Sequence, residues 1–157
     1  MRYLAIDLGD QRTGLAVGDS VTRLAGPVGV LEVPIATNGG GALLDAIAAA
    51  ADEQLGRASE AGRRRAAGQL VVGLPLNMDG TEGGRAKLVR EFAARLSKRT
   101  GRTLRFQDER LSTADADWAM ARSGLTRKQK KERRDALAAA AILTDFLASL
   151  SQNPGDG

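Results

Sequence analysis

The order of apolar and polar positions predicts three strands before any helix. Residues 2–8 and 12–18 are apolar runs joined by a short glycine-containing turn, a pattern typical of a β-hairpin. Residues 26–33 form a third strand-like stretch, and Pro27 is tolerated at the start of a strand. The following segment, PIATNGGG at 34–41, is expected to be a flexible loop.

Helical spacing and continuous apolar runs alternate in the middle of the chain. Apolar residues at helical spacing predict a helix over 42–55, and its end is left open because the polar stretch 56–67 could extend it. Residues 69–76, QLVVGLPL, are continuously apolar, as expected for a buried, central strand. A second helix is predicted over about 82–99, with Thr81 as its N-cap.

The last third of the chain predicts one more strand and two more helices. Residues 103–107 form the strand, and Ser112 can cap a short helix that ends at about 122. The segment 126–134, TRKQKKERR, is expected to be a basic loop, and the last helix to span about 134–149. Three strands followed by alternating helices and strands predict an α/β fold: a mixed sheet with helices on both faces.

Composition narrows the possible classes of protein. The 157 residues fit a single domain, expected over 1–150, with residues 151–157 as a disordered tail. No segment has the pattern of a signal peptide or the length of a membrane span, so a cytoplasmic location without membrane contact is expected. The absence of cysteine and histidine excludes thiolate zinc sites and serine–histidine catalysis. A net charge of +4 favours polyanionic partners.

Three groups of acidic residues stand in unusual settings. Asp7 ends an apolar strand, Asp108 and Glu109 directly follow another, and Asp135 opens the apolar run ALAAAAIL. Such acids could converge at one sheet edge and hold Mg²⁺, whose ions support phosphodiester hydrolysis without histidine. Each acid also has a structural alternative: Asp7 in a turn, the next two paired with Arg110 or capping a helix, and Asp135 at a helix N-terminus.

Two further stretches could contact phosphate. GLPLNMDGT at 73–81 lies between a strand and a helix, where Asn77 and Thr81 could bind a phosphate, although an ordinary strand-to-helix turn with a cap is the favoured explanation. The basic segment 127–134 holds six Lys or Arg residues and borders Asp135, so it could steer a phosphate backbone. The alternative is an exposed, solvated run of charge.

Four motifs together resemble a known family. AIDLGDQRTGLAVGD, VVGLPLNMDGTEG, DERLST and RDALAAAAIL are similar to the YqgF family, also called RuvX, of pre-16S rRNA nucleases, formerly described as Holliday junction resolvases. The resemblance implies an RNase H-like fold with a five-stranded sheet, related to the RuvC resolvase. It also implies a divalent metal, Mg²⁺ or Mn²⁺, and maturation of the 5′ end of 16S rRNA. The family's catalytic and metal-binding acids map to Asp7, Glu109 and Asp135.

We therefore expect a metal-dependent nuclease that acts on pre-16S rRNA or a pre-ribosomal particle, as a monomer or weak dimer. Branched DNA is the alternative substrate. The alternative function is that of a non-catalytic RNA-binding assembly factor. An ATP-binding module is disfavoured, because such proteins use two domains of this kind and this chain is long enough for only one. The chain departs from the family pattern at Asp10, an extra acid beside the site, and at 56–68, which looks like an insertion. The candidates for substrate binding are Thr13, Asn77, Thr81, Arg110, Ser112, Arg127, Lys128, Lys130 and Lys131.

Overall fold

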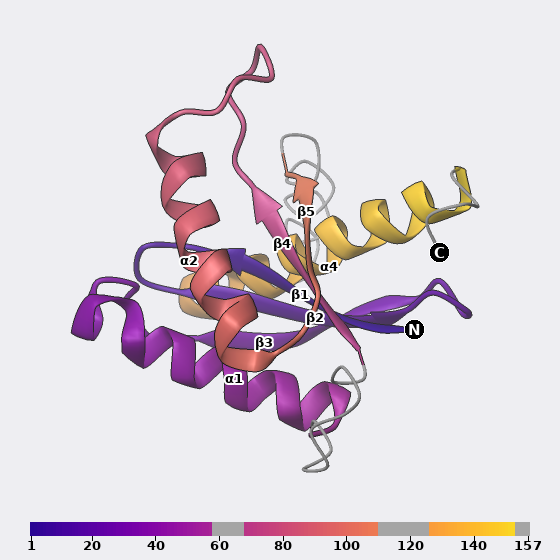
Figure 1. Cartoon of the computed structure of the whole chain (residues 1–157), viewed down its shortest axis with the longest axis horizontal. Helices are drawn as coiled ribbons and strands as arrows, with labels where there is room; N and C mark the ends of the chain where they lie inside the picture. The colour runs from indigo at the N-terminus through magenta and orange to yellow at the C-terminus, as the bar shows by residue number, and fades with distance from the viewer. Residues whose placement is uncertain (58–67, 110–125, 153–157) are drawn as a thin grey trace.

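Five strands form one mixed sheet in the computed structural model, which describes residues 1–57, 68–109 and 126–152 (Figure 1). The order across the sheet is β3-β2-β1-β4-β5. Strands β1, β2 and β3 pair antiparallel, whereas β1, β4 and β5 run parallel. This arrangement confirms the predicted five-stranded mixed sheet. The bounds are β1 (Arg2–Leu8), β2 (Thr13–Asp19), β3 (Ala25–Leu31), β4 (Gln69–Leu74) and β5 (Leu104–Asp108).

Helices cover both faces of the sheet, as predicted (Figure 1). Helices α1 (Gly41–Leu55) and α2 (Gly84–Thr100) lie on one face, and α4 (Arg127–Gln152) lies on the other. A short 3-10 helix, η1 (Thr37–Gly40), leads into α1 within the segment expected to be a loop. No helix in the described part of the chain is both long and apolar enough to span a membrane.

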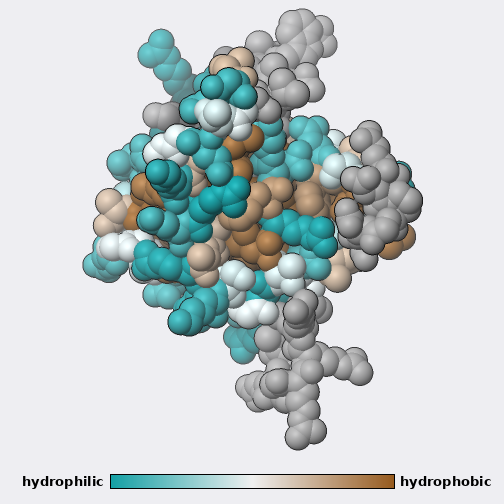
Figure 2. Space-filling view, turned by 45° about the horizontal axis from the view of Figure 1, so that its top comes forward, coloured by the Kyte–Doolittle hydropathy of each residue, from teal (hydrophilic) through white to brown (hydrophobic). Residues whose placement is uncertain are grey.

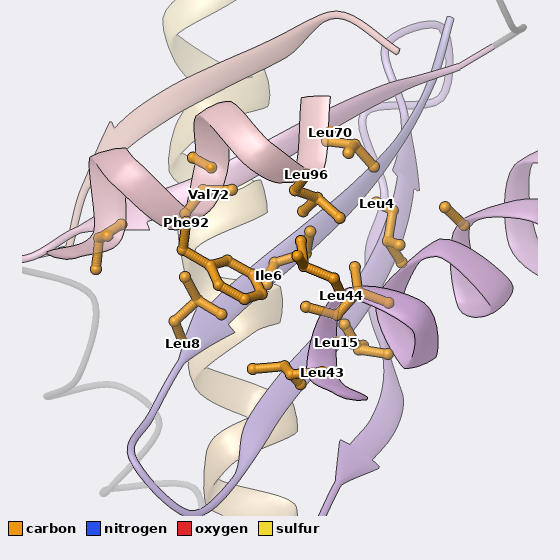
Figure 3. Packing of buried hydrophobic residues seen from close by; sticks show 14 of the residues in the cluster. Leu4, Ile6, Leu8, Leu15, Leu43, Leu44, Leu70, Val72, Phe92 and Leu96 are labelled. Atoms are coloured by element: carbon orange, nitrogen blue, oxygen red, sulfur yellow. The ribbon is translucent and has the colours of Figure 1, made fainter. Parts of the chain in front are cut away.

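Alternation along β1 divides the core into two layers. Leu4, Ile6 and Leu8 point toward α1 and α2, where they meet Leu43 of α1 and Phe92 of α2 (Figure 3). All of these side chains are at most 7% exposed. Successive side chains of a strand point to opposite faces, so this layer uses the even-numbered positions of β1.

The odd-numbered positions of β1 face α4. Tyr3 and Ala5 pack with Leu143 and Phe146 of α4 in the second core layer, and the Tyr3 ring meets the Phe146 ring edge-on at 5.1 Å. Asp7 is the next odd-numbered position, so its carboxyl lies on this same face, at the end of the strand. On the surface, hydrophilic residues dominate the view in Figure 2, with apolar residues exposed across its middle.

Two predicted helix starts are wrong. Helix α2 begins at Gly84, and its N-cap is Gly83, which has no capping side chain, so Thr81 does not cap it. Helix α4 begins at Arg127, which makes the predicted basic loop the start of a helix. Lys, Arg, Gln and Glu are good helix formers, and the stretch from Arg127 to the predicted start holds only these residue types.

Two helix ends can be compared with the prediction. Helix α1 ends at Leu55, because Gly56 adopts a positive φ of 87°. The rest of the possible extension, residues 58–67, lies outside the described residues. Helix α4 continues to Gln152, which is two residues into the predicted tail. The predicted helix after Ser112 lies outside the described residues.

Candidate active site

Two carboxyl groups meet at the carboxyl ends of the parallel strands. Asp7 is the second-last residue of β1, and Glu109 directly follows β5, where its N–H donates to the carbonyl of Leu74 at 3.4 Å. The two side chains are joined by a hydrogen bond, although β4 lies between their strands. Gly73 of β4 makes this possible, because a Cβ there would lie only 2.7 Å from Glu109 Oε2.

Asp135 reaches the same area from α4. Gly14 of β2 pairs with Asp7 in the sheet register, and a Cβ on Gly14 would lie 1.9 Å from the backbone oxygen of Asp135. The absence of a side chain at Gly14 therefore lets the first half of α4 lie directly against the sheet. The three predicted acids come from β1, the end of β5 and α4, as the sequence suggested.

The crowding of acids shows in their pKa values. Burial raises the pKa of Asp7 to about 8, aided by the charge and hydrogen bond of Glu109 and by the charge of Asp135. Burial also raises the pKa of Glu109, aided by the charge of Asp108 and opposed by the hydrogen bond from Asp7. These directions fit a pair in which Asp7 holds a proton and donates it to the ionised Glu109.

The donor set suits a divalent cation only in part. Asp7 and Glu109 offer hard oxygen ligands at a place with excess negative charge, which is what Mg²⁺ binds. Among the described residues, however, no three Asp, Glu, His or Cys side chains form a complete metal-binding group. Asp135 acts on Asp7 through its charge without completing such a group.

Arg85 is a site residue that the sequence did not reveal. It is the second residue of α2, and its guanidinium donates to the Leu8 carbonyl at 3.0 Å and to the Asp10 carboxylate. Its positive charge lowers the pKa of both Asp7 and Glu109. In the sequence, an arginine in the first turn of an amphipathic helix is typical of a solvated surface charge. Only its position after β4 could have suggested that Arg85 lies near the candidate site.

Thr13 is placed differently from the expectation. Its residue pair in the sheet is Leu8, so it faces α1 and α2, opposite to Asp7. It is 0% exposed, and its hydroxyl has no hydrogen-bond partner within the described part of the chain. In this conformation the hydroxyl is enclosed, so the predicted phosphate contact is not available to it.

Asn77 and Thr81 lie in a turn stabilised by its own side chains. Asn77 Nδ2 donates to Thr81 Oγ1 at 3.0 Å, and Thr81 Oγ1 donates to Asp79 Oδ1 at 2.6 Å. Both residues are exposed beyond the end of β4. The structure therefore supports the simpler interpretation of this motif, a structured strand-to-helix turn, and leaves substrate contact by these residues a prediction.

The basic candidates begin α4. Arg127 is exposed at the first residue of the helix, and the backbone of Lys128, Lys130 and Lys131 is helical. These positions therefore lie one to two helical turns before Asp135 along the α4 backbone. The other two candidates, Arg110 and Ser112, lie outside the described residues.

Comparisons with known proteins agree with this geometry. The model of the RuvX family, described as Holliday junction resolvase, matches residues 1–149. A relative from Anaeromyxobacter sp. strain Fw109-5, named "Putative pre-16S rRNA nuclease", is 41% identical over 94% of this chain and 96% of its own. A relative of the same name from Rhodospirillum centenum is 40% identical over 96% of this chain and 75% of its own.

A solved structure shares the fold. The fowlpox virus resolvase, solved with Holliday junction DNA, superposes with a TM-score of 0.52 over 96% of this chain and 99% of its own, at 11% identity. This similarity confirms the predicted RNase H-like fold. The family match over nearly the whole chain confirms the resemblance drawn from the four motifs, and it supports a hydrolytic nuclease. The chain belongs to the RuvX family.

Proposed function

We propose that this chain is a metal-dependent endonuclease that cleaves a phosphodiester bond of precursor 16S rRNA, in the maturation of its 5′ end. The observation that carries the proposal is the meeting of Asp7 and Glu109 at the sheet edge where the parallel strands end. The names of the relatives support RNA as the substrate class. On this account the protein acts in the cytoplasm on RNA within a pre-ribosomal particle.

Asp7 and Glu109 would hold the divalent cation, Mg²⁺ or Mn²⁺, with Asp135 as the third acid. Such a cation supplies a nucleophile at neutral pH and stabilises the charge on the phosphate. The chain's own residues supply the setting: β1 and β5 fix the two carboxyls on rigid strands, and Gly73 leaves the space between them. Without the cation, Asp7 and Glu109, which are partly buried, share a proton between their carboxyls.

Four-way DNA is the alternative substrate. The family description and the fowlpox resolvase both name Holliday junctions. Symmetric cleavage of a junction requires two sites related by a two-fold axis, and hence a dimer. The RNA proposal requires only one site, and the names of the relatives support it.

Cleavage assays test the proposal. Wild-type protein is incubated with an RNA carrying the 5′ precursor sequence of 16S rRNA, and separately with a four-way DNA junction, each with Mg²⁺ or Mn²⁺. We expect RNA cleavage by wild type, and a loss of at least about 100-fold in Asp7→Asn. The matched control is Asp45→Asn, which removes an exposed carboxyl from α1. Cleavage of neither substrate, or an active Asp7→Asn, contradicts the nuclease; cleavage of the junction alone contradicts RNA as the substrate.

A further inference from the structure

The guanidinium of Arg85 binds two acceptors of different character. One nitrogen donates to the carbonyl of Leu8 at 3.0 Å, in the last position of β1. The other donates to the carboxylate of Asp10, whose side chain is 73% exposed. The Arg85 side chain is itself 37% exposed, so its outer edge is open to solvent.

The first acceptor is fixed and the second can move. The carbonyl of Leu8 belongs to a strand that pairs on both sides. The Asp10 backbone is also held, because the Ile35 N–H donates to its carbonyl at 3.1 Å. Only the carboxylate of Asp10 can rotate away, and an exposed ion pair of this kind contributes little stability.

We propose that Arg85 binds a phosphate of the substrate, and that the Asp10 carboxylate occupies the place of this phosphate while substrate is absent. A guanidinium matches the geometry of a phosphate as well as that of a carboxylate. Its charge acts on both Asp7 and Glu109, so a phosphate held there would lie beside the candidate active site. The inference rests on the proposed function and names a residue that contacts its substrate.

The two residues should then act in opposite directions. Loss of Arg85 removes a charged contact and should weaken RNA binding about tenfold or more. Loss of the Asp10 charge removes a competitor and should tighten binding, by up to about fivefold. A purely structural ion pair would behave otherwise, because either substitution would then weaken the protein in the same direction.

Fluorescence anisotropy with a labelled single-stranded RNA tests this in an Asp7→Asn background, in which binding is measured without cleavage. The variants are Arg85→Ala, Arg85→Lys and Asp10→Asn. The controls are Arg99→Ala and Asp45→Asn, which change charge equally at another exposed ion pair, 3.5 Å long, between α2 and α1. Circular dichroism confirms that each variant is folded.

We expect weaker binding for Arg85→Ala, partial recovery in Arg85→Lys, and tighter binding for Asp10→Asn than for Asp45→Asn. The slope of log affinity against log salt should also fall by about 0.7 in Arg85→Ala. Arg85→Ala binding like Arg99→Ala overturns the phosphate contact, and Asp10→Asn binding no tighter than its control overturns the competition. Because wild-type cleavage is measured separately, either failure is distinct from a failure of the proposed nuclease.

Discussion

Asp7 carries most of the electrostatic cost of the candidate site. Its carboxyl is partly buried and feels the charge of two other acids, and the charge of Arg85 offsets this only partly. An apolar residue at this position would carry no such cost, as Tyr3 and Ala5 show on the same face of β1. The electrostatic cost of an acid at this position is offset if a cation binds its carboxylate during function.

The raised pKa of Asp7 predicts how the free energy of unfolding depends on pH when divalent cations are absent. The folded pKa of Asp7, about 8, exceeds the ordinary value of 3.8, so the folded state keeps a proton that the unfolded chain loses. The contribution of protonated Asp7 to the free energy of unfolding is therefore complete below about pH 4 and is lost as pH rises toward 8.

Urea denaturation in EDTA between pH 4 and pH 8 measures the effect. Relative to wild type, Asp7→Asn should gain free energy of unfolding as pH rises, because it lacks the group that must ionise. Asp45→Asn, at an exposed position, serves as the control and should follow wild type. Parallel pH profiles for wild type and Asp7→Asn would show that Asp7 is not destabilised by its surroundings.

The convergence of Asp7 and Glu109 at one sheet edge was predictable, whereas the residues that contact them were not. Asp7 and Glu109 interrupt or follow apolar strands, and a displaced acid is a signal that a single sequence can show. Arg85 contacts Asp10, which lies 75 residues earlier in the sequence. No local sequence pattern indicates such a contact. Thr13 lies on the α1/α2 face of the sheet, opposite to Asp7. Its placement depends on the register of β2 against β1, which the sequence does not show.

Helix α4 approaches the sheet closely because small residues line its path. Gly14, Ala16 and Gly18 of β2 face it, and a Cβ on Gly18 would lie 2.9 Å from Leu143. The close approach brings Asp135 of α4 near Asp7. Small residues on this face are therefore a requirement of the site as well as of packing.

Gly14→Ala should separate α4 from the sheet. The added methyl group would meet the backbone of Asp135, which cannot rotate away as a side chain would. We expect a loss of about 1–3 kcal/mol of stability and a lower Tm, by about 2–4 °C for each kcal/mol, together with loss of cleavage. Calorimetry and the RNA assay measure both effects.

Gly26→Ala in β3 is the matched control, because no atom lies within 4 Å of its Cβ position. It should keep both stability and cleavage. If Gly14→Ala were as stable and active as Gly26→Ala, the position of α4 against β2 would be incorrect.

Strand and helix types were predictable, whereas the starts of α2 and α4 were not. The hairpin, the buried run that became β4 and the helical spacing of apolar residues in α1 each reflect burial, which periodicity indicates directly. The starts of α2 and α4 depend on which backbone groups find partners. At α2 the side chains of Asn77, Asp79 and Thr81 bind each other and leave Gly83 as the N-cap.

Across the molecule, 23 basic residues against 19 acidic ones predict attraction to a polyanion, and α4 begins with a dense group of them. Reversing the exposed Arg133 to Glu should weaken RNA binding several-fold and reduce its salt dependence. Arg57→Glu is the control, since Arg57 is an exposed arginine beside Gly56, whose carbonyl accepts from Arg102 just before the start of β5. Equal effects of the two substitutions would mean that the start of α4 has no special role in binding.

The central claim is that Asp7 and Glu109 hold a divalent cation. Electron paramagnetic resonance of free Mn²⁺ tests it most directly, because bound Mn²⁺ disappears from the aqueous signal. We predict that wild type and Asp45→Asn bind Mn²⁺ and that Asp7→Asn binds at least about tenfold more weakly. No binding by wild type, or equal binding by Asp7→Asn, would contradict the account.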